Sequence, residues 1–74
     1  MTKFKEGDNV ILVDKVWADN GQIFTAGQGG WIVDVLRPGE RYVVEFAAHD
    51  HPDYPGVPNF THAEVNDRDL IWGD

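Results

Sequence analysis

The 74-residue chain contains neither cysteine nor serine. Without cysteine it can form no disulfide framework and no thiolate metal site. The aliphatic hydroxyls that remain belong to Thr2, Thr25 and Thr61, and only Thr61 has a histidine, His62, beside it. So short a chain also has little room for a cleft that holds two catalytic carboxylates. We therefore expect a protein that is not an enzyme and needs no cofactor.

Basic residues are also scarce. Six Lys and Arg stand against 13 Asp and Glu, which gives a formal net charge of −7. Nucleic acids are bound largely through basic side chains that neutralise phosphates, so we expect no nucleic-acid partner. An acidic surface suits a basic protein partner, and it also keeps a small protein in solution.

Long apolar runs are missing as well. No stretch approaches the roughly 18 consecutive apolar residues that a membrane span requires, and the N-terminal residues are polar and charged. We expect a cytoplasmic protein without a signal peptide and without membrane contact. Apolar residues never recur with the 3.6-residue period of a helix over ten positions, which predicts an all-β chain.

The clearest pattern that is present lies between residues 27 and 46. Residues 31–36 and 42–46 are rich in β-branched and aromatic residues whose positions alternate between two faces, which indicates two strands, and the Arg-Pro-Gly-Glu sequence at 37–40 indicates a tight turn between them. Three glycines before the first strand would allow a bulge or a close backbone approach. A phosphate-binding loop is excluded because such loops need a helix after the glycines, and a strand follows here.

The other elements follow from β-branched residues, turn signals and alternation. We predict a strand over 9–14, an irregular hairpin over 15–26 that turns at Asp19-Asn20-Gly21, a proline-stiffened loop over 47–58, a strand over 59–65, one 3₁₀ turn over 66–69, and a last strand over 70–72 that pairs with the first.

These elements predict one domain, residues 1–74, that forms a small five-stranded SH3-like partly open barrel with a single 3₁₀ turn before the last strand. A barrel suits so short a chain because it leaves few unpaired strand edges. The alternative is an OB fold, but the sequence offers no candidate for the helix between its third and fourth strands. We expect Trp31, Tyr42, Phe46 and Phe60 to supply the aromatic part of the core.

The remaining aromatic residues lie in predicted loops or near the end of the chain. Trp17, Phe24, Tyr54 and Trp72 form this set, and the acidic residues Asp19, Asp50 and Asp53 lie close to it in the sequence. Exposed aromatic side chains inside an acidic rim are typical of a protein-docking surface, here on residues 15–26 and 47–58. The alternative is that these aromatic side chains plug the ends of the barrel.

A second kind of site is suggested by the histidines. His49 and His51 would point the same way in an extended segment, and His62 lies on the following predicted strand. Together the three could bind a metal ion, although no spacing typical of a metalloenzyme is present. A small metal-binding protein or metal-dependent enzyme is therefore the alternative to a docking module.

The order and spacing of several motifs resemble a superfamily of SH3-like barrels. The motifs are Gly7-Asp8-Asn9-Val10-Ile11-Leu12, Trp17, Gly27-x-x-Gly30-Trp31-Ile32-Val33, Val43-Val44-Glu45-Phe46 and Tyr54-x-Gly56-Val57-x-Asn59-Phe60-x-x-x-Glu64-Val65, and they cover nearly the whole chain. The superfamily includes the small stromal barrel subunit of photosystem I, the variable chain of ferredoxin–thioredoxin reductase and the β subunit of nitrile hydratase, and the chain is most similar to small bacterial proteins of that fold.

In those families the barrel docks on a larger protein and carries no redox centre or nucleophile of its own. The resemblance therefore implies a non-catalytic module that binds a protein partner, and self-association through strand edges and aromatic side chains is a further expectation. The photosystem subunit presents basic residues to ferredoxin, whereas this chain is acidic, and its segment 54–60 is shorter. The resemblance thus implies docking but not the particular partner.

Overall fold

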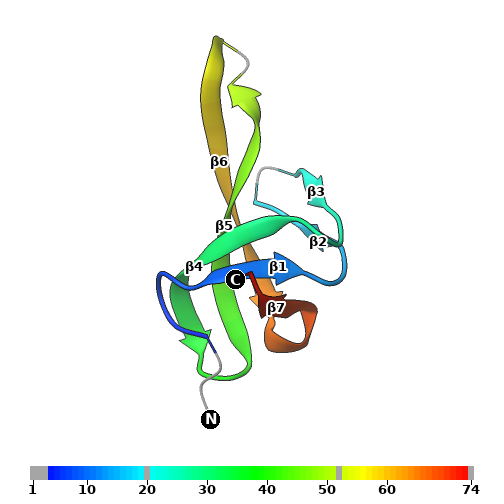
Figure 1. Cartoon of the computed structure of the whole chain (residues 1–74), viewed down its shortest axis with the longest axis vertical. Coiled ribbons are helices and arrows are strands. Elements are labelled where there is room, and N and C mark those ends of the chain that lie inside the picture. The colour runs from blue at the N-terminus through cyan, green and yellow to red at the C-terminus, as the bar shows by residue number, and fades with distance from the viewer. Residues whose placement is uncertain (1–3, 20, 52, 74) are drawn as a thin grey trace.

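The computed structural model describes residues 4–19, 21–51 and 53–73, with the side chains of 48–51, 54, 55, 57 and 58 outside the described part. The described residues form strands and one 3₁₀ turn, which confirms the all-β prediction. The elements are β1 (Asn9–Leu12), β2 (Val16–Trp17), β3 (Ile23–Phe24), β4 (Gly29–Arg37), β5 (Arg41–His51), β6 (Tyr54–Asn66), the 3₁₀ turn η1 (Asp67–Asp69) and β7 (Leu70–Trp72) (Figure 1).

Five of the strands form one antiparallel sheet in the order β6-β5-β4-β1-β7, and β2 and β3 form a separate antiparallel pair. The predicted turn between β4 and β5 is confirmed, since the Glu40 N–H donates to the Arg37 carbonyl at 2.9 Å and Gly39 has a φ of 75°. The predicted pairing of the last strand with the first is also confirmed, with Leu12 opposite Leu70.

Residues 47–51 and 54–58 do not form the predicted loop. They continue β5 and β6 as a long hairpin, here called the arm, that rises from the body of the molecule in Figure 1. The arm makes the chain elongated, with extents of 42 × 22 × 20 Å. Prolines at 55 and 58 are compatible with a strand because β6 lies at the edge of the sheet, where a missing N–H need not break the ladder.

The core lies on the inner face of the sheet. Its largest side chains are Tyr42, Phe4, Phe46, Leu12 and Ile32, each at most 1% exposed. Two further groups complete it, the aliphatic residues Val10, Val16, Val44, Val65 and Leu70, and the smaller or partly shielded residues Ala18, Phe24 and Ala63. The Phe46 and Tyr42 predictions are therefore confirmed.

The prediction that Trp31 and Phe60 belong to the core is wrong. Trp31 is half-buried and Phe60 is 47% exposed. On β4 the neighbours Trp31 and Ile32 point to opposite faces, with Ile32 inward. A register shift between Ile32 and Asp34 then interrupts the alternation, so Val35 packs against the core although it has the same parity as Trp31. On β6 the buried positions are Thr61, Ala63 and Val65, which places Phe60 on the outer face with its neighbours of the same parity.

The edge strands β6 and β7 do not pair with each other in the described residues. The turn of the β2–β3 hairpin instead lies against the open edge of β6, where the Asp19 N–H donates to the His62 carbonyl at 2.8 Å. This bond satisfies one edge carbonyl and fixes the hairpin beside the base of the arm.

The 3₁₀ turn η1 is fastened to the sheet by Tyr42. The Tyr42 hydroxyl donates to Asp67 Oδ1 at 2.9 Å, and the Asp67 N–H donates to the Glu40 carbonyl at 2.8 Å. Burial raises the pKa of the Tyr42 hydroxyl, and the hydrogen bond to the Asp67 carboxylate raises it further. The described residues include no helix long and apolar enough to span a membrane.

Candidate functional site

The most exposed aromatic side chain among the large hydrophobic residues is Trp17, which is 67% exposed. It lies on β2 directly opposite Ile23 of β3, and Ile23 is 43% exposed. We call this pair the β2–β3 face. Asp14, Lys15 and Asp19 are exposed nearby in the sequence, so an apolar centre is flanked by charged residues. The irregular hairpin predicted for residues 15–26 is confirmed by the pairing of β2 with β3.

Phe24 was expected either in a docking surface or as a plug of the barrel. It is 5% exposed, and its ring stacks on that of Phe46 with centroids 4.7 Å apart and an interplanar angle of 26°. In a two-residue strand the neighbouring side chains point to opposite sides, so exposed Ile23 and buried Phe24 follow from the same backbone. The structure thus places Phe24 in the core and outside any exposed surface.

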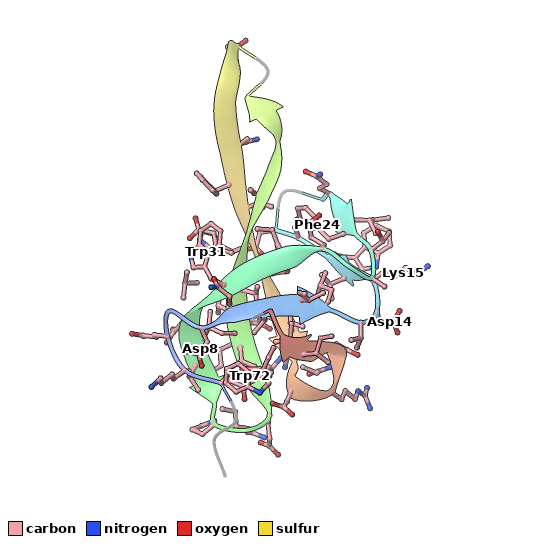
Figure 2. All side chains as sticks on the ribbon, viewed as in Figure 1. Asp8, Asp14, Lys15, Phe24, Trp31 and Trp72 are labelled. Atoms are coloured by element: carbon pink, nitrogen blue, oxygen red, sulfur yellow. The ribbon has the colours of Figure 1, made fainter. Side chains whose placement is uncertain are left out.

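Trp72 is 50% exposed but is not part of the β2–β3 face. Its ring packs edge-on against Phe4 at 4.7 Å, and Phe4 in turn contacts Tyr42 at 5.4 Å. Figure 2 shows Trp72 beside β7 and Phe24 beside β3, so the two labelled aromatic residues lie at separate ends of the body. One face of Trp72 therefore covers the core and the other remains exposed.

The rest of the predicted docking set belongs to the arm. Asp53 is exposed, whereas the side chains of Tyr54 and Asp50 lie outside the described residues. The backbone of the arm is described, and its register pairs residue 50 with 58 and His51 with Tyr54. The predicted aromatic set is thus divided among the arm, the β2–β3 face, the core and the end of β7.

A further aromatic pair lies on the outer face of the sheet. Trp31 of β4 and Phe60 of β6 meet with ring centroids 5.6 Å apart and an interplanar angle of 72°, although one strand separates them. We call this pair the outer aromatic corner. The sequence carried a signal for it, because Phe60 shares strand parity with the polar residues His62 and Glu64.

A groove of about 400 Å³ adjoins the corner. Its lining comprises Asn9, Val10, Ile11, Gly27, Gly29, Gly30, Trp31 and Gly73. The groove exists because Gly29, which shares the outer face with Trp31 and lies opposite Ile11, has no side chain. Gly30 points inward, where a Cβ would lie 2.8 Å from a Phe46 ring atom and 2.7 Å from the Glu45 carbonyl.

The nearest charged residues on this face are Glu45 and His62. Glu45 lies opposite Trp31 in the β4–β5 register, and its side chain is 22% exposed. The His62 Nε2 lies 3.7 Å from a Glu45 carboxylate oxygen, and this contact is ionic only when the imidazole is protonated. Further along the same face, Arg41 pairs with Glu64 at 3.2 Å.

The register bears on the predicted three-histidine site. His62 lies opposite Glu45, whereas His51 follows Glu45 by six residues along the same strand. The backbones of these two residues are therefore separated along the sheet. Groups of three metal-binding side chains are absent from the part of the chain that the structure describes, and the side chains of His49 and His51 lie outside that part.

Metal binding by His49, His51 and His62 stays a prediction. Isothermal titration with Zn²⁺ tests it, with the His51→Ala variant as the matched control. Heat from the parent chain that the variant loses would support the site, and no heat from the parent would exclude it.

No family model matches the chain, and comparison with curated proteins and with solved structures finds no similar protein. The resemblance to the superfamily of accessory barrels therefore stays a prediction, and the function has to be argued from the surfaces described above.

Proposed function

We propose that the chain is an SH3-like barrel that serves as a non-catalytic docking module for another protein. The strand order supports the barrel, because the five-stranded antiparallel sheet places the first strand, β1, between β4 and the last strand, β7. The 3₁₀ turn before β7 and the hairpin inserted between β1 and β4 agree with it. The docking surface comprises residues 15–26, which carry the β2–β3 face, and residues 47–58, which include the arm.

The observation that carries the proposal is the exposure of Trp17. A tryptophan that is 67% exposed contributes little to the core, and it lies beside a second exposed apolar residue, Ile23. Tryptophan is among the residues that most often supply the binding energy of protein interfaces when a partner excludes water from it. The charged residues that flank the pair would form the polar rim of such an interface.

The position of the hairpin relative to the arm supports a joint surface. The Asp19–His62 hydrogen bond holds the β2–β3 turn against β6, and β6 continues directly into the arm. Figure 1 shows the arm rising beside β3, so a partner that contacts the β2–β3 face can also contact the base of the arm. Such a partner would be held by two elements that a rigid sheet positions.

The proposal is tested by affinity capture from native lysate, with size-exclusion chromatography and light scattering of the captured complex. Parent chain, Trp17→Ser and Leu36→Ser are compared. Leu36 is 45% exposed and lies next to the β4–β5 turn, at the end of the sheet away from the arm, so it is a matched apolar control.

We expect a stoichiometric complex from the parent and from Leu36→Ser, and its loss from Trp17→Ser at an unchanged melting temperature. A monomer without a captured partner would contradict docking. Equal capture by all three chains would contradict the assignment to the β2–β3 face, and a parent chain that forms only homo-oligomers would replace the foreign partner with a second copy.

A further inference from the structure

We propose that the outer aromatic corner, together with Glu45, binds the guanidinium group of an arginine in a basic partner segment that lies along the adjoining groove. The proposal rests on the proposed docking function and adds the chemistry of the partner. It uses a different face from the β2–β3 face, so each can be tested without the other.

The corner has the shape that a planar cation needs. Trp31 and Phe60 meet nearly at right angles, at 72°, and both rings remain partly accessible. A cation over the face of a tryptophan within about 6 Å of its centroid is attracted by the ring's quadrupole. Arginine satisfies this geometry better than lysine because its guanidinium is planar and stacks on an aromatic ring.

A carboxylate adjoins the corner. Glu45 is the direct register partner of Trp31, which places the two Cβ atoms about 5 Å apart. Its side chain is only 22% exposed, so a cation that reached it would be partly shielded from water. A guanidinium can donate two N–H groups to one carboxylate while its plane lies on a ring, and the His62 imidazole at 3.7 Å is the group it would compete with.

The groove accounts for the rest of the partner segment. It has about 400 Å³ of space, within the range of small-ligand sites, and its lining contains no charged residue. Because Gly29 has no side chain, there is room next to Trp31, between β1 and β4. An extended segment can therefore lie on this uncharged lining with an arginine directed to Trp31.

The net negative charge of the chain favours a partner segment of positive charge. Thirteen acidic side chains stand against six basic ones. Two basic side chains form ion pairs away from Trp31, Arg37 with Glu40 and Arg41 with Glu64. A basic segment would be attracted to this surface and an acidic one repelled.

The test is an NMR titration of the full chain with a short arginine-containing peptide, Gly-Arg-Gly-Arg-Gly, and with the same peptide carrying citrulline in place of arginine. Citrulline has nearly the same shape but no charge. The indole N–H signals of the three tryptophans are assigned with Trp17→Phe, Trp31→Phe and Trp72→Phe.

We expect the arginine peptide to shift the Trp31 indole signal and the backbone signals of Glu45 and Phe60, with an affinity about tenfold above that of the citrulline peptide. Glu45→Gln should lower the affinity, whereas Glu40→Gln removes the same charge at an exposed position and should leave it unchanged. Gly29→Val should fill the groove and weaken binding in a chain that still gives a folded spectrum.

Equal shifts from the two peptides, or shifts confined to Trp17 and Trp72, would overturn the proposal. The outcome is separate from that of the capture experiment. Capture that depends on Trp17 without an arginine effect at Trp31 rejects this inference alone, and an arginine effect at Trp31 without capture of any protein rejects the proposed docking function alone.

Discussion

The two faces of the central sheet differ in how their aromatic side chains are used. On the inner face Phe46 is fully buried and stacks on Phe24, and Tyr42 is fully buried and bonded to Asp67. On the outer face Trp31 and Phe60 contact each other but remain partly exposed, next to a groove in which Gly29 carries no side chain. The same sheet, through β4, β5 and β6, thus supports a packed core on one side and an open aromatic surface on the other.

This difference separates stability from recognition. The free energy of folding depends on the apolar area removed from water and on close packing without cavities. Both are properties of the inner face. The outer aromatic residues remove less of their area from water within the chain, so they retain surface that a partner can bury. Substitutions on the inner face should therefore lower mainly the stability of the fold, and substitutions on the outer face should weaken mainly the binding of a partner.

The largest effect should come from Phe46→Ala. Removing a fully buried ring that another ring stacks against leaves a cavity and costs about 3–5 kcal/mol in the free energy of unfolding. Urea denaturation followed by circular dichroism measures it. The matched substitution on the other face, Phe60→Ala, should cost only about 1 kcal/mol, the value of an aromatic pair. Equal losses would contradict the division between the faces.

A neighbouring pair of glycines sharpens the comparison. In Gly30→Ala the new methyl would meet the Glu45 carbonyl and the Phe46 ring at under 3 Å, and we expect a loss of about 1–3 kcal/mol from overpacking. In Gly29→Ala the nearest atom is the Val10 carbonyl at 4.0 Å, so stability should stay the same or rise slightly. Thermal unfolding measures the stability of both variants. If Gly29→Ala were the less stable of the two, the assignment of Gly30 to the inner face and Gly29 to the outer face would be wrong.

The Tyr42–Asp67 hydrogen bond tests the inner face through pH. Tyr42→Phe should lower the free energy of unfolding by about 1.5 kcal/mol at neutral pH, because it removes a bond to a carboxylate. The raised pKa of Tyr42 means that the folded chain holds this proton more tightly than the unfolded chain. Its contribution is therefore complete below the unfolded pKa of about 10 and is lost as the pH rises through the folded pKa.

The difference between parent and Tyr42→Phe should accordingly be constant from neutral pH to about pH 9 and should shrink above about pH 10. Denaturation of both chains at a series of pH values measures this difference. The neighbouring aromatic residues Phe4 and Trp72 are the same in both chains. A difference that grew with pH would show that the hydroxyl does not donate to Asp67 in the folded state.

The smallest effect on stability should come from Trp17→Ser. A side chain that is 67% exposed contributes little to the core, so the free energy of unfolding should change by no more than about 0.5 kcal/mol. The shift in melting temperature measures this change. A loss of several kcal/mol would show that Trp17 supports the fold and would weaken its assignment as a binding anchor.

Much of the fold could be predicted from local signals. The Arg-Pro-Gly-Glu turn, the short hairpin around Asp19 and Gly21, and the 3₁₀ turn before β7 each rest on residues whose backbone preferences decide the conformation. The arm could not be predicted in this way. Prolines suggested a loop, but the edge position of β6 lets a strand tolerate them, and that position is a property of the whole sheet.

The candidate site was predicted only in part, and for physical reasons. Trp17 and its exposure follow from a short hairpin that cannot bury both faces, whereas Phe24 on the same hairpin is buried by its contact with Phe46. The register shift after Ile32 places Trp31 and Val35 on different faces although they have the same parity, which alternation alone does not reveal. The groove depends on the pairing of Gly29 with Ile11 across two strands.

Site-specific photo-crosslinking tests the assignment of the docking surfaces most directly. A benzophenone amino acid is placed at position 17, 60 or 36 of otherwise intact chains, and each chain is irradiated in native lysate. We predict that positions 17 and 60 crosslink to the same protein and that position 36 does not. No crosslink from positions 17 and 60, or equal crosslinking from all three, would contradict the account.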